Sequence, residues 1–158
     1  MRSGERPGRA RRRGHPLVFA ALCCAALHAV AIDNPDLPDL VGAFVARDER
    51  ARTAIDQSPT QAASLAAYAD YERFLQGELT AALAALREQL GDDERRRLDA
   101  AQSRWVAWRD AESRFITGTW RRDAFGSSAG LSRGAYRCTV LRDRVRALLQ
   151  YRKDQPSR

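Results

Sequence analysis

The chain has 158 residues and a formal charge of +7, from 27 basic and 20 acidic side chains. Six arginines and one acid lie in residues 1–31, so the remainder holds 21 basic and 19 acidic residues. A remainder so close to neutrality gives no electrostatic support for a nucleic-acid partner. It is long enough for one modest hydrophobic core and too short for two.

Residues 1–31 have the pattern of a signal peptide. A basic stretch precedes an apolar run, Leu17–Ile32, which contains the small-x-small cleavage pattern Ala29-Val30-Ala31. The run is short for a membrane span, so an uncleaved anchor is the less favoured alternative. Cys23 and Cys24 lack the small preceding residue that lipidation requires. We therefore expect export by the general secretory route, with cleavage near Ala31, to a periplasmic or secreted location, and no membrane span afterwards.

Both histidines, His15 and His28, fall within this leader, and the rest of the chain keeps one cysteine, Cys138. Ser-His-Asp and Cys-His catalysis are therefore excluded, as are metal sites built on histidine or on several thiolates. We expect no cofactor. Because one cysteine cannot form an internal disulfide, packing must stabilise the fold. Cys138 is either a buried small residue or an intermolecular link.

Residues 32–57 predict an extended segment followed by an N-terminal helix. Leu37 or Asp36 is the expected cap, with Pro38 in the first turn. Apolar residues recur at helical spacing, and charged residues such as Arg47 and Asp48 are expected mainly on the other faces.

Residues 58–152 predict a helical domain, which a polar tail, 153–158, follows. Its first helix should begin at Ser58-Pro59 and end near Leu90, before Gly91. Gly77 within that helix costs about 1 kcal/mol relative to alanine, which suggests that a neighbour approaches closely there. Glu72 is an acid on the apolar seam of this helix and is expected to turn toward water.

A tight turn, with Asp92 or Asp93 as cap, predicts an antiparallel hairpin with a long third helix that ends near Thr117-Gly118. One face of this helix should be buried, because mostly apolar residues recur there at intervals of three and four: Leu98, Ala101, Trp105, Trp108, Glu112 and Phe115. Arg109 lies one turn from Trp105 and from Glu112, so it is expected to cover a ring and pair with the carboxylate. Such a pair fits either a satisfied core contact or a recognition surface.

We expect residues 119–130 to be the one irregular stretch and a last helix to cover about 132–152. The inner face of that helix should carry the following apolar residues: Leu131, Ala135, Cys138, Leu141, Val145, Leu148 and Leu149. The irregular stretch contains Trp120, Arg121, Arg122 and Phe125, which either fold back onto the core or form a binding surface. The predicted fold is all-α, a small antiparallel bundle of about four helices around a central long hairpin.

The stretch AQSRWVAWRDAE resembles the signature of the bacterial envelope family named after the lysozyme inhibitor LprI. The matching positions on one helix include Ala101, Gln102, Trp105, Trp108, Arg109, Asp110 and Glu112. Ser113 stands where the family usually has a cysteine. The resemblance implies an exported, all-helical, non-catalytic protein that binds lysozyme, and the missing cysteine pair indicates a divergent member.

The sequence supports three hypotheses. The first is a binding protein of the lysozyme-inhibitor type, whose partner is a lysozyme or another envelope protein and whose anchors are the aromatic and basic residues of 119–130. The second is a structural or assembly protein of the periplasm that binds a partner helix. The third, less favoured, is a small hydrolase that uses Glu72 and Glu112 as acid and base. The sequence does not determine the oligomeric state.

Overall fold

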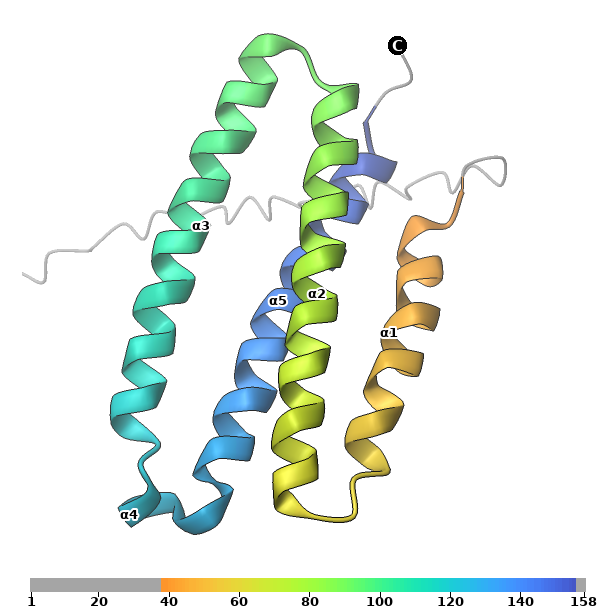
Figure 1. Cartoon of the computed structure of the whole chain (residues 1–158). Helices are drawn as coiled ribbons and strands as arrows, with labels where there is room; N and C mark the ends of the chain where they lie inside the picture. The colour runs from red at the N-terminus through yellow and green to blue at the C-terminus, as the bar shows by residue number, and fades with distance from the viewer. Residues whose placement is uncertain (1–37, 156–158) are drawn as a thin grey trace, which may run out of the picture. The chain divides into compact units, whose positions relative to one another are not determined.

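The computed structural model describes residues 38–155, which belong to one compact unit, Asn34–Arg158. The predicted signal peptide, the extended segment before Pro38 and residues 156–158 of the tail lie outside this described range. The elements, in order, are α1 (Leu40–Asp56), α2 (Gln61–Gln89), α3 (Asp92–Thr119), α4 (Arg122–Phe125), the 3-10 turn η1 (Gly126–Ser128) and α5 (Ala129–Lys153). Figure 1 shows the four long helices alternating in direction. The predicted all-α helical bundle is confirmed, and α2 and α3 are joined by a short turn as predicted, but the central pair is α2 with α5 and not the α2–α3 hairpin.

The helices begin at caps that differ from the predicted ones. The Asp39 carboxylate accepts a hydrogen bond from the Gly42 amide at 2.8 Å and starts α1. Thr60 caps α2, and its hydroxyl accepts from the Ala63 amide at 3.1 Å. Gly91 is the N-cap of α3. In each case the residue with extended or non-helical backbone directly before the first turn is the cap.

Ser58 was predicted to start the second helix, and this prediction is wrong. Its hydroxyl donates to the Ala54 carbonyl at 2.6 Å, so Ser58 closes the end of α1 instead. The carbonyls of a last helical turn lack intrahelical partners, and a hydroxyl can satisfy one of them.

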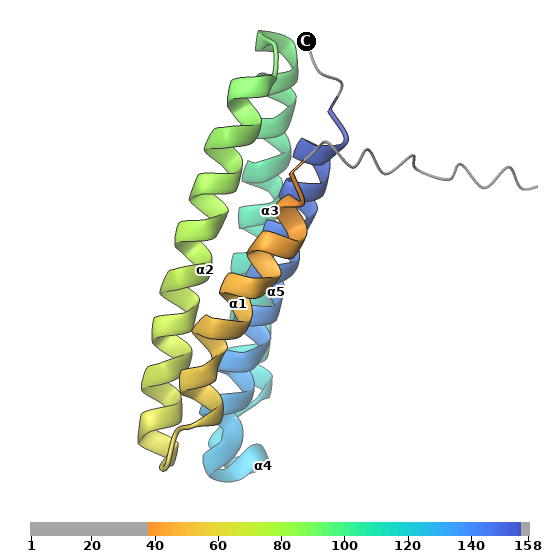
Figure 2. The same cartoon turned by 90° about the vertical axis from the view of Figure 1, so that its right-hand side faces the viewer.

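The core lies mainly between α2 and α5, which run in the same direction and pack most extensively. α1 covers one side of this pair and α3 lies on the other, as Figures 1 and 2 show. The buried cluster consists of residues at helical spacing: Phe44, Tyr71, Leu75, Leu79, Ala82, Leu86, Leu90, Cys138, Leu141, Val145, Leu148 and Leu149. Most of the predicted inner face of the last helix is therefore confirmed, whereas Leu131 and Ala135 are only half-buried.

The close helix contact is at two glycines of α5 and not at Gly77. A Cβ atom on Gly134 would lie 3.2 Å from the Tyr68 side chain, and one on Gly130 would lie 3.1 Å from Leu65. A Cβ on Gly77 would meet nothing within 4 Å, so the predicted close approach there is wrong. The two glycines are four residues apart on one face of α5, which lets the α2 backbone approach that face closely.

One carboxylate that was expected on an outer face is in the core. Asp48 is 5% exposed and accepts a hydrogen bond from the hydroxyl of Tyr71, which is 4% exposed. The pairing satisfies two polar groups that would be costly to bury alone. Its neighbour Arg47 also has a partner, because its guanidinium pairs with Glu78 at 2.7 Å.

Within residues 38–155, no helix has the length and hydropathy needed to cross a membrane. The same part of the chain contains no cluster of three or more His, Cys, Asp or Glu residues that could hold a metal ion.

Candidate functional site

The inner face of α3 is half polar, and it agrees only in part with the face that the spacing of apolar residues predicted: Leu98, Trp105 and Glu112 turn inward. Trp108 is 49% exposed and Phe115 is 61% exposed, and Ala101 is exposed as well. The only α3 residue in the buried class is Ile116. The residues that turn toward the bundle lie on a neighbouring stripe with the same helical spacing: Leu98, Gln102, Trp105, Arg109, Glu112 and Ile116. The helix therefore leaves two large aromatic rings in solvent.

Trp105 is the central contact of this stripe. It packs against the edge of the core, and two guanidinium groups lie over its ring. The Arg109 carbon Cζ is 5.3 Å from the ring centroid, and that of Arg144 on α5 is 5.6 Å away. Both distances are within the range of cation–π attraction. The predicted contact of Arg109 with a tryptophan ring is confirmed.

Arg144 is held in place by an uncharged partner. Its Nε and one terminal nitrogen donate to the Gln102 side-chain oxygen at 3.1 and 3.0 Å. Burial lowers the pKa of the Arg144 guanidinium from its ordinary value. No carboxylate among the described residues forms an ion pair with Arg144, so its charge is not neutralised locally.

The predicted pairing of Arg109 with Glu112 is wrong. Arg109 pairs with its neighbour Asp110, with 2.8 Å between guanidinium nitrogen and carboxylate oxygen. Glu112 instead accepts a hydrogen bond from the Tyr136 hydroxyl of α5 at 2.8 Å. This hydrogen bond raises the pKa of Tyr136, because the carboxylate favours the protonated phenol.

The two acids singled out as a possible catalytic pair line one cleft of about 180 Å³ between α2, α3 and α5. Each already has a partner. Glu72 pairs with Arg137 at 3.1 Å, which corrects the expectation that Glu72 turns toward water. Glu112 accepts from Tyr136. Carboxylates in a partly buried helix interface require such hydrogen-bonding or ion-pair partners. The structural role of the two acids therefore accounts for their position.

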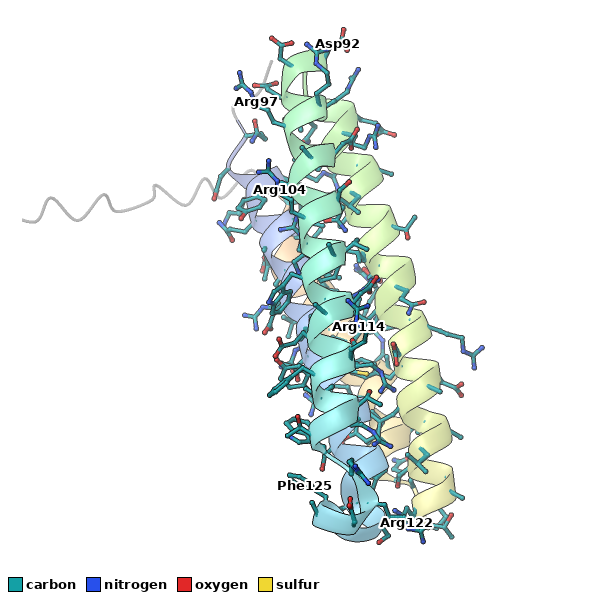
Figure 3. The ribbon with its side chains drawn as sticks, turned by 90° about the vertical axis from the view of Figure 1, so that its left-hand side faces the viewer. Asp92, Arg97, Arg104, Arg114, Arg122 and Phe125 are labelled. Carbon is teal, nitrogen blue, oxygen red and sulfur yellow. The ribbon has the colours of Figure 1, made fainter. Side chains whose placement is uncertain are left out.

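The corner where α3 turns into α5 is more ordered than the predicted irregular stretch. It contains α4 and η1, and α5 begins at Ala129, three residues before the predicted start. Gly126 has a φ of +60°, which favours glycine at the end of α4. Figure 3 shows Arg122 and Phe125 at this end of the bundle.

The four binding candidates of this corner lie close together. Trp120 is half-buried, with ring centroids 6.1 Å from Phe125 and 5.4 Å from Tyr136, the latter edge-on. Phe125 is 44% exposed. Arg121 is exposed and pairs with Asp123 at 3.3 Å, whereas Arg122 is exposed and has no ion-pair partner within 38–155. Trp120 thus folds back onto the bundle, and the other three residues face solvent.

A family model described as Lysozyme inhibitor LprI matches residues 52–148, which is more than half of the chain. The chain belongs to the LprI lysozyme inhibitor family. No curated protein and no solved structure is significantly similar to it. The LprI match extends from within α1 to within α5 and includes the α3 signature, so the resemblance noted from Ala101–Glu112 is confirmed.

This LprI protein has no disulfide between described residues. Ser113 occupies the position where a cysteine is usual, and Cys138 on α5 is a free thiol that is 2% exposed. The structure therefore supports the buried small residue and not the intermolecular link. Burial raises the pKa of the Cys138 thiol to about 12, so the thiol stays protonated and unreactive at neutral pH.

Sequence reasoning missed the α5 side of the site. Tyr136 and Arg144 contact the α3 signature through Glu112, Gln102 and Trp105. Their spacing in the sequence could have revealed them. Tyr136, Val140 and Arg144 follow one another at intervals of four residues and therefore lie along one face of a helix.

Proposed function

We propose that this chain is an exported, non-catalytic protein of the bacterial envelope that binds and inhibits lysozyme. Membership of the LprI family is the observation that carries the proposal. The predicted signal peptide supports export, and the lack of histidine after residue 31 is compatible with a role that involves no catalysis.

We place the contact surface at the corner formed by Trp120, Arg121, Arg122 and Phe125. Glycosidases such as lysozyme carry two carboxylates in their cleft, and a protruding cation beside an aromatic anchor complements such a cleft. The exposed Arg122 has no ion-pair partner in the described chain, and Phe125 is 44% exposed. Figure 3 shows both residues at the same end of the bundle. Trp120 supports the corner from beneath through Phe125 and Tyr136.

The test measures inhibition of a chicken-type lysozyme with a short soluble chitooligosaccharide as substrate. We expect the purified protein to inhibit, and the double change Arg122→Ser, Phe125→Ala to weaken inhibition at least about tenfold, as expected for an interface hot spot. The change Trp120→Ala, Arg122→Ala should act in the same direction. Arg97→Ser is the matched control, because Arg97 is exposed at the other end of α3 (Figure 3).

Inhibition that the double change abolishes, with unchanged helix content by circular dichroism, would support both the activity and its place. A parent protein that does not inhibit at high micromolar concentration would overturn the inhibitor proposal. Equal inhibition by the parent and the double variant would overturn the location at this corner.

A further inference from the structure

A second surface of the protein is a groove between α3 and α5, which we call the α3–α5 groove. Its volume is about 450 Å³, within the range of roughly 300–1,000 Å³ for small-molecule sites. The lining comes from two α3 tryptophans and one face of α5: Trp105, Trp108, Tyr136, Thr139, Val140, Asp143, Arg144 and Ala147. None of the four corner residues lines it, although the groove residue Tyr136 contacts Trp120 of the corner.

One wall of the groove is aromatic. Trp108 is 49% exposed, although its neighbour Trp105 is packed against the core and covered by two guanidinium groups. An indole ring left half in water on a helix provides a flat apolar face with one polar N–H group. Such a face can stack against another flat or ring-shaped apolar surface.

The other wall, from α5, combines the apolar residues Val140 and Ala147 with hydrogen-bonding groups of both kinds. Asp143 offers acceptors, Thr139 offers a hydroxyl and Arg144 offers donors. Arg144 belongs to this wall. Its guanidinium donates to the neutral Gln102 oxygen, and no carboxylate of residues 38–155 pairs with it. A half-buried guanidinium without a counter-charge is a favourable place for a ligand carboxylate.

We propose that the α3–α5 groove binds an oligosaccharide that bears carboxylate groups. A pyranose ring presents C–H groups on its flat face and hydroxyls at its edge, and each hydroxyl both donates and accepts hydrogen bonds. The C–H face stacks on Trp108, the hydroxyls meet Asp143 and Thr139, and the carboxylate pairs with Arg144.

The lining favours a sugar over an acidic peptide. Helix-binding grooves have aliphatic pockets for the i, i+3 and i+4 anchors of the bound helix. The exposed lining of the α3–α5 groove is also mostly apolar, but its composition is different. Here the apolar material is largely aromatic, and a donor, an acceptor and a hydroxyl stand together on the opposite wall. The basic edge of α3 adds long-range attraction for an acidic ligand, since Arg97 and Arg104 are exposed and form no ion pair with a described residue (Figure 3).

The test uses isothermal titration of the purified protein with two glycans of equal length and contains no lysozyme. The acidic probe is a peptide-free tetrasaccharide of alternating N-acetylglucosamine and N-acetylmuramic acid, and the neutral probe is chitotetraose. This inference depends on the proposed envelope role only because that role suggested a cell-wall glycan as the acidic probe. We expect the acidic glycan to bind at least tenfold more tightly than the neutral one.

Three variants locate the site. Trp108→Ala should weaken binding of both glycans at least tenfold, because it removes the stacking face. Arg144→Gln should lower the affinity for the acidic glycan to that for chitotetraose, with helix content checked by circular dichroism. Phe115→Ala is the matched control, since Phe115 is also an exposed aromatic residue of α3 but does not line the groove, and it should bind as the parent does.

Absence of binding to either glycan at millimolar concentration would overturn the proposal. Equal affinity for the two glycans would overturn the role of Arg144, and an equal loss in Trp108→Ala and Phe115→Ala would overturn the location. If a short acidic peptide bound the groove in a Trp108-dependent way and the glycans did not, the ligand class would be wrong. A protein that binds the glycan but does not inhibit lysozyme would retain this site and lose the proposed function.

Discussion

Asp48, Tyr71 and Cys138 are three ionisable groups in a core that is otherwise apolar. The Asp48–Tyr71 hydrogen bond and burial both raise the pKa of the phenol, with burial the larger cause. Burial likewise raises the pKa of the Cys138 thiol, from 9.0 to about 12. In both groups the folded protein therefore holds its proton to a higher pH than the unfolded chain does.

The expected consequence is a loss of stability in alkaline solution. Above pH 9 the unfolded thiol releases its proton while the folded one keeps it, so the free energy of unfolding should fall as the pH rises toward 12. The slope from this single group approaches about 1.4 kcal/mol per pH unit. Tyr71 acts in the same direction above pH 10, its unperturbed value. Urea unfolding between pH 8 and 11 measures the slope.

Cys138→Ala is the control for this prediction. It creates a small cavity and lowers stability at every pH, but the decline between pH 9 and 10 should become shallower because the thiol is gone. An unchanged slope would show that the Cys138 pKa does not differ between the folded and unfolded states.

At the scale of single elements, α5 depends on glycine where it meets α2. Gly130 and Gly134 lie opposite Leu65 and Tyr68, and a Cβ on Gly134 would press on the Cβ and Cγ atoms of Tyr68 at 3.2 Å. These atoms are close to the α2 backbone and cannot swing aside as the end of a long side chain can. The usual gain of helix stability from Gly→Ala is therefore opposed by crowding at this position.

Gly77 and Gly134 make a matched pair for testing this contact. Gly77→Ala should stabilise the protein by about 1 kcal/mol, since nothing lies within 4 Å of the added methyl group. Gly134→Ala should give no such gain and should destabilise by roughly 1–2 kcal/mol if Tyr68 does not move. Thermal unfolding of both variants is the measurement, and an equal gain at both positions would contradict the close α2–α5 contact.

The α3 helix shows how a strong local pattern can select the wrong face. Leu98, Trp105 and Phe115 suggested one apolar stripe, but only the residues near α5 turn inward, and Phe115 is 61% exposed. Hydrogen bonds from α5 to Gln102 and Glu112 orient the helix instead. Because these partners are more than 20 positions away in sequence, spacing within α3 could not reveal them.

For the whole molecule, the packing is uneven. α2, α5 and α1 share the buried apolar cluster, whereas α3 adds one fully buried residue, Ile116, and partly buried contacts from Leu98 and Trp105. The α3 contacts with α5 include two polar ones, Arg144 with Gln102 and Tyr136 with Glu112, and the Arg144 guanidinium over the Trp105 ring. A helix held in this way should open more readily than the rest of the bundle.

Amide hydrogen exchange measures this difference directly. We expect the central amides of α3 to exchange at least about tenfold faster than those of α2, which corresponds to an opening free energy lower by roughly 1.4 kcal/mol. The two helices have nearly equal lengths, 28 and 29 residues, so α2 serves as the internal reference. Equal protection would mean that the polar contacts hold α3 as firmly as the core holds α2.

The sequence by itself determined the class of fold and the family. Helical spacing of apolar residues and the turn at Gly91 were enough for an all-α bundle, because these signals are local. The α3 signature was enough for the LprI family, and the distribution of histidine excluded several kinds of chemistry. The inner face of α5 from Cys138 to Leu149 was likewise predictable, since its neighbours only require that it be apolar.

Only the tertiary structure decided which residues meet. In the folded protein Arg109 forms an ion pair with Asp110, Trp108 is exposed to solvent and the Arg144 guanidinium lies over the Trp105 ring. The close helix contact is at Gly134 and not at Gly77. The exposure of Trp108, the contact of Arg144 with Trp105 and the place of the close glycine contact depend on the rotation of one helix against another. A small rotation exchanges a buried position for an exposed one without changing the local helix energy. The rotation is determined by long-range packing and hydrogen bonding between helices, which no local pattern records.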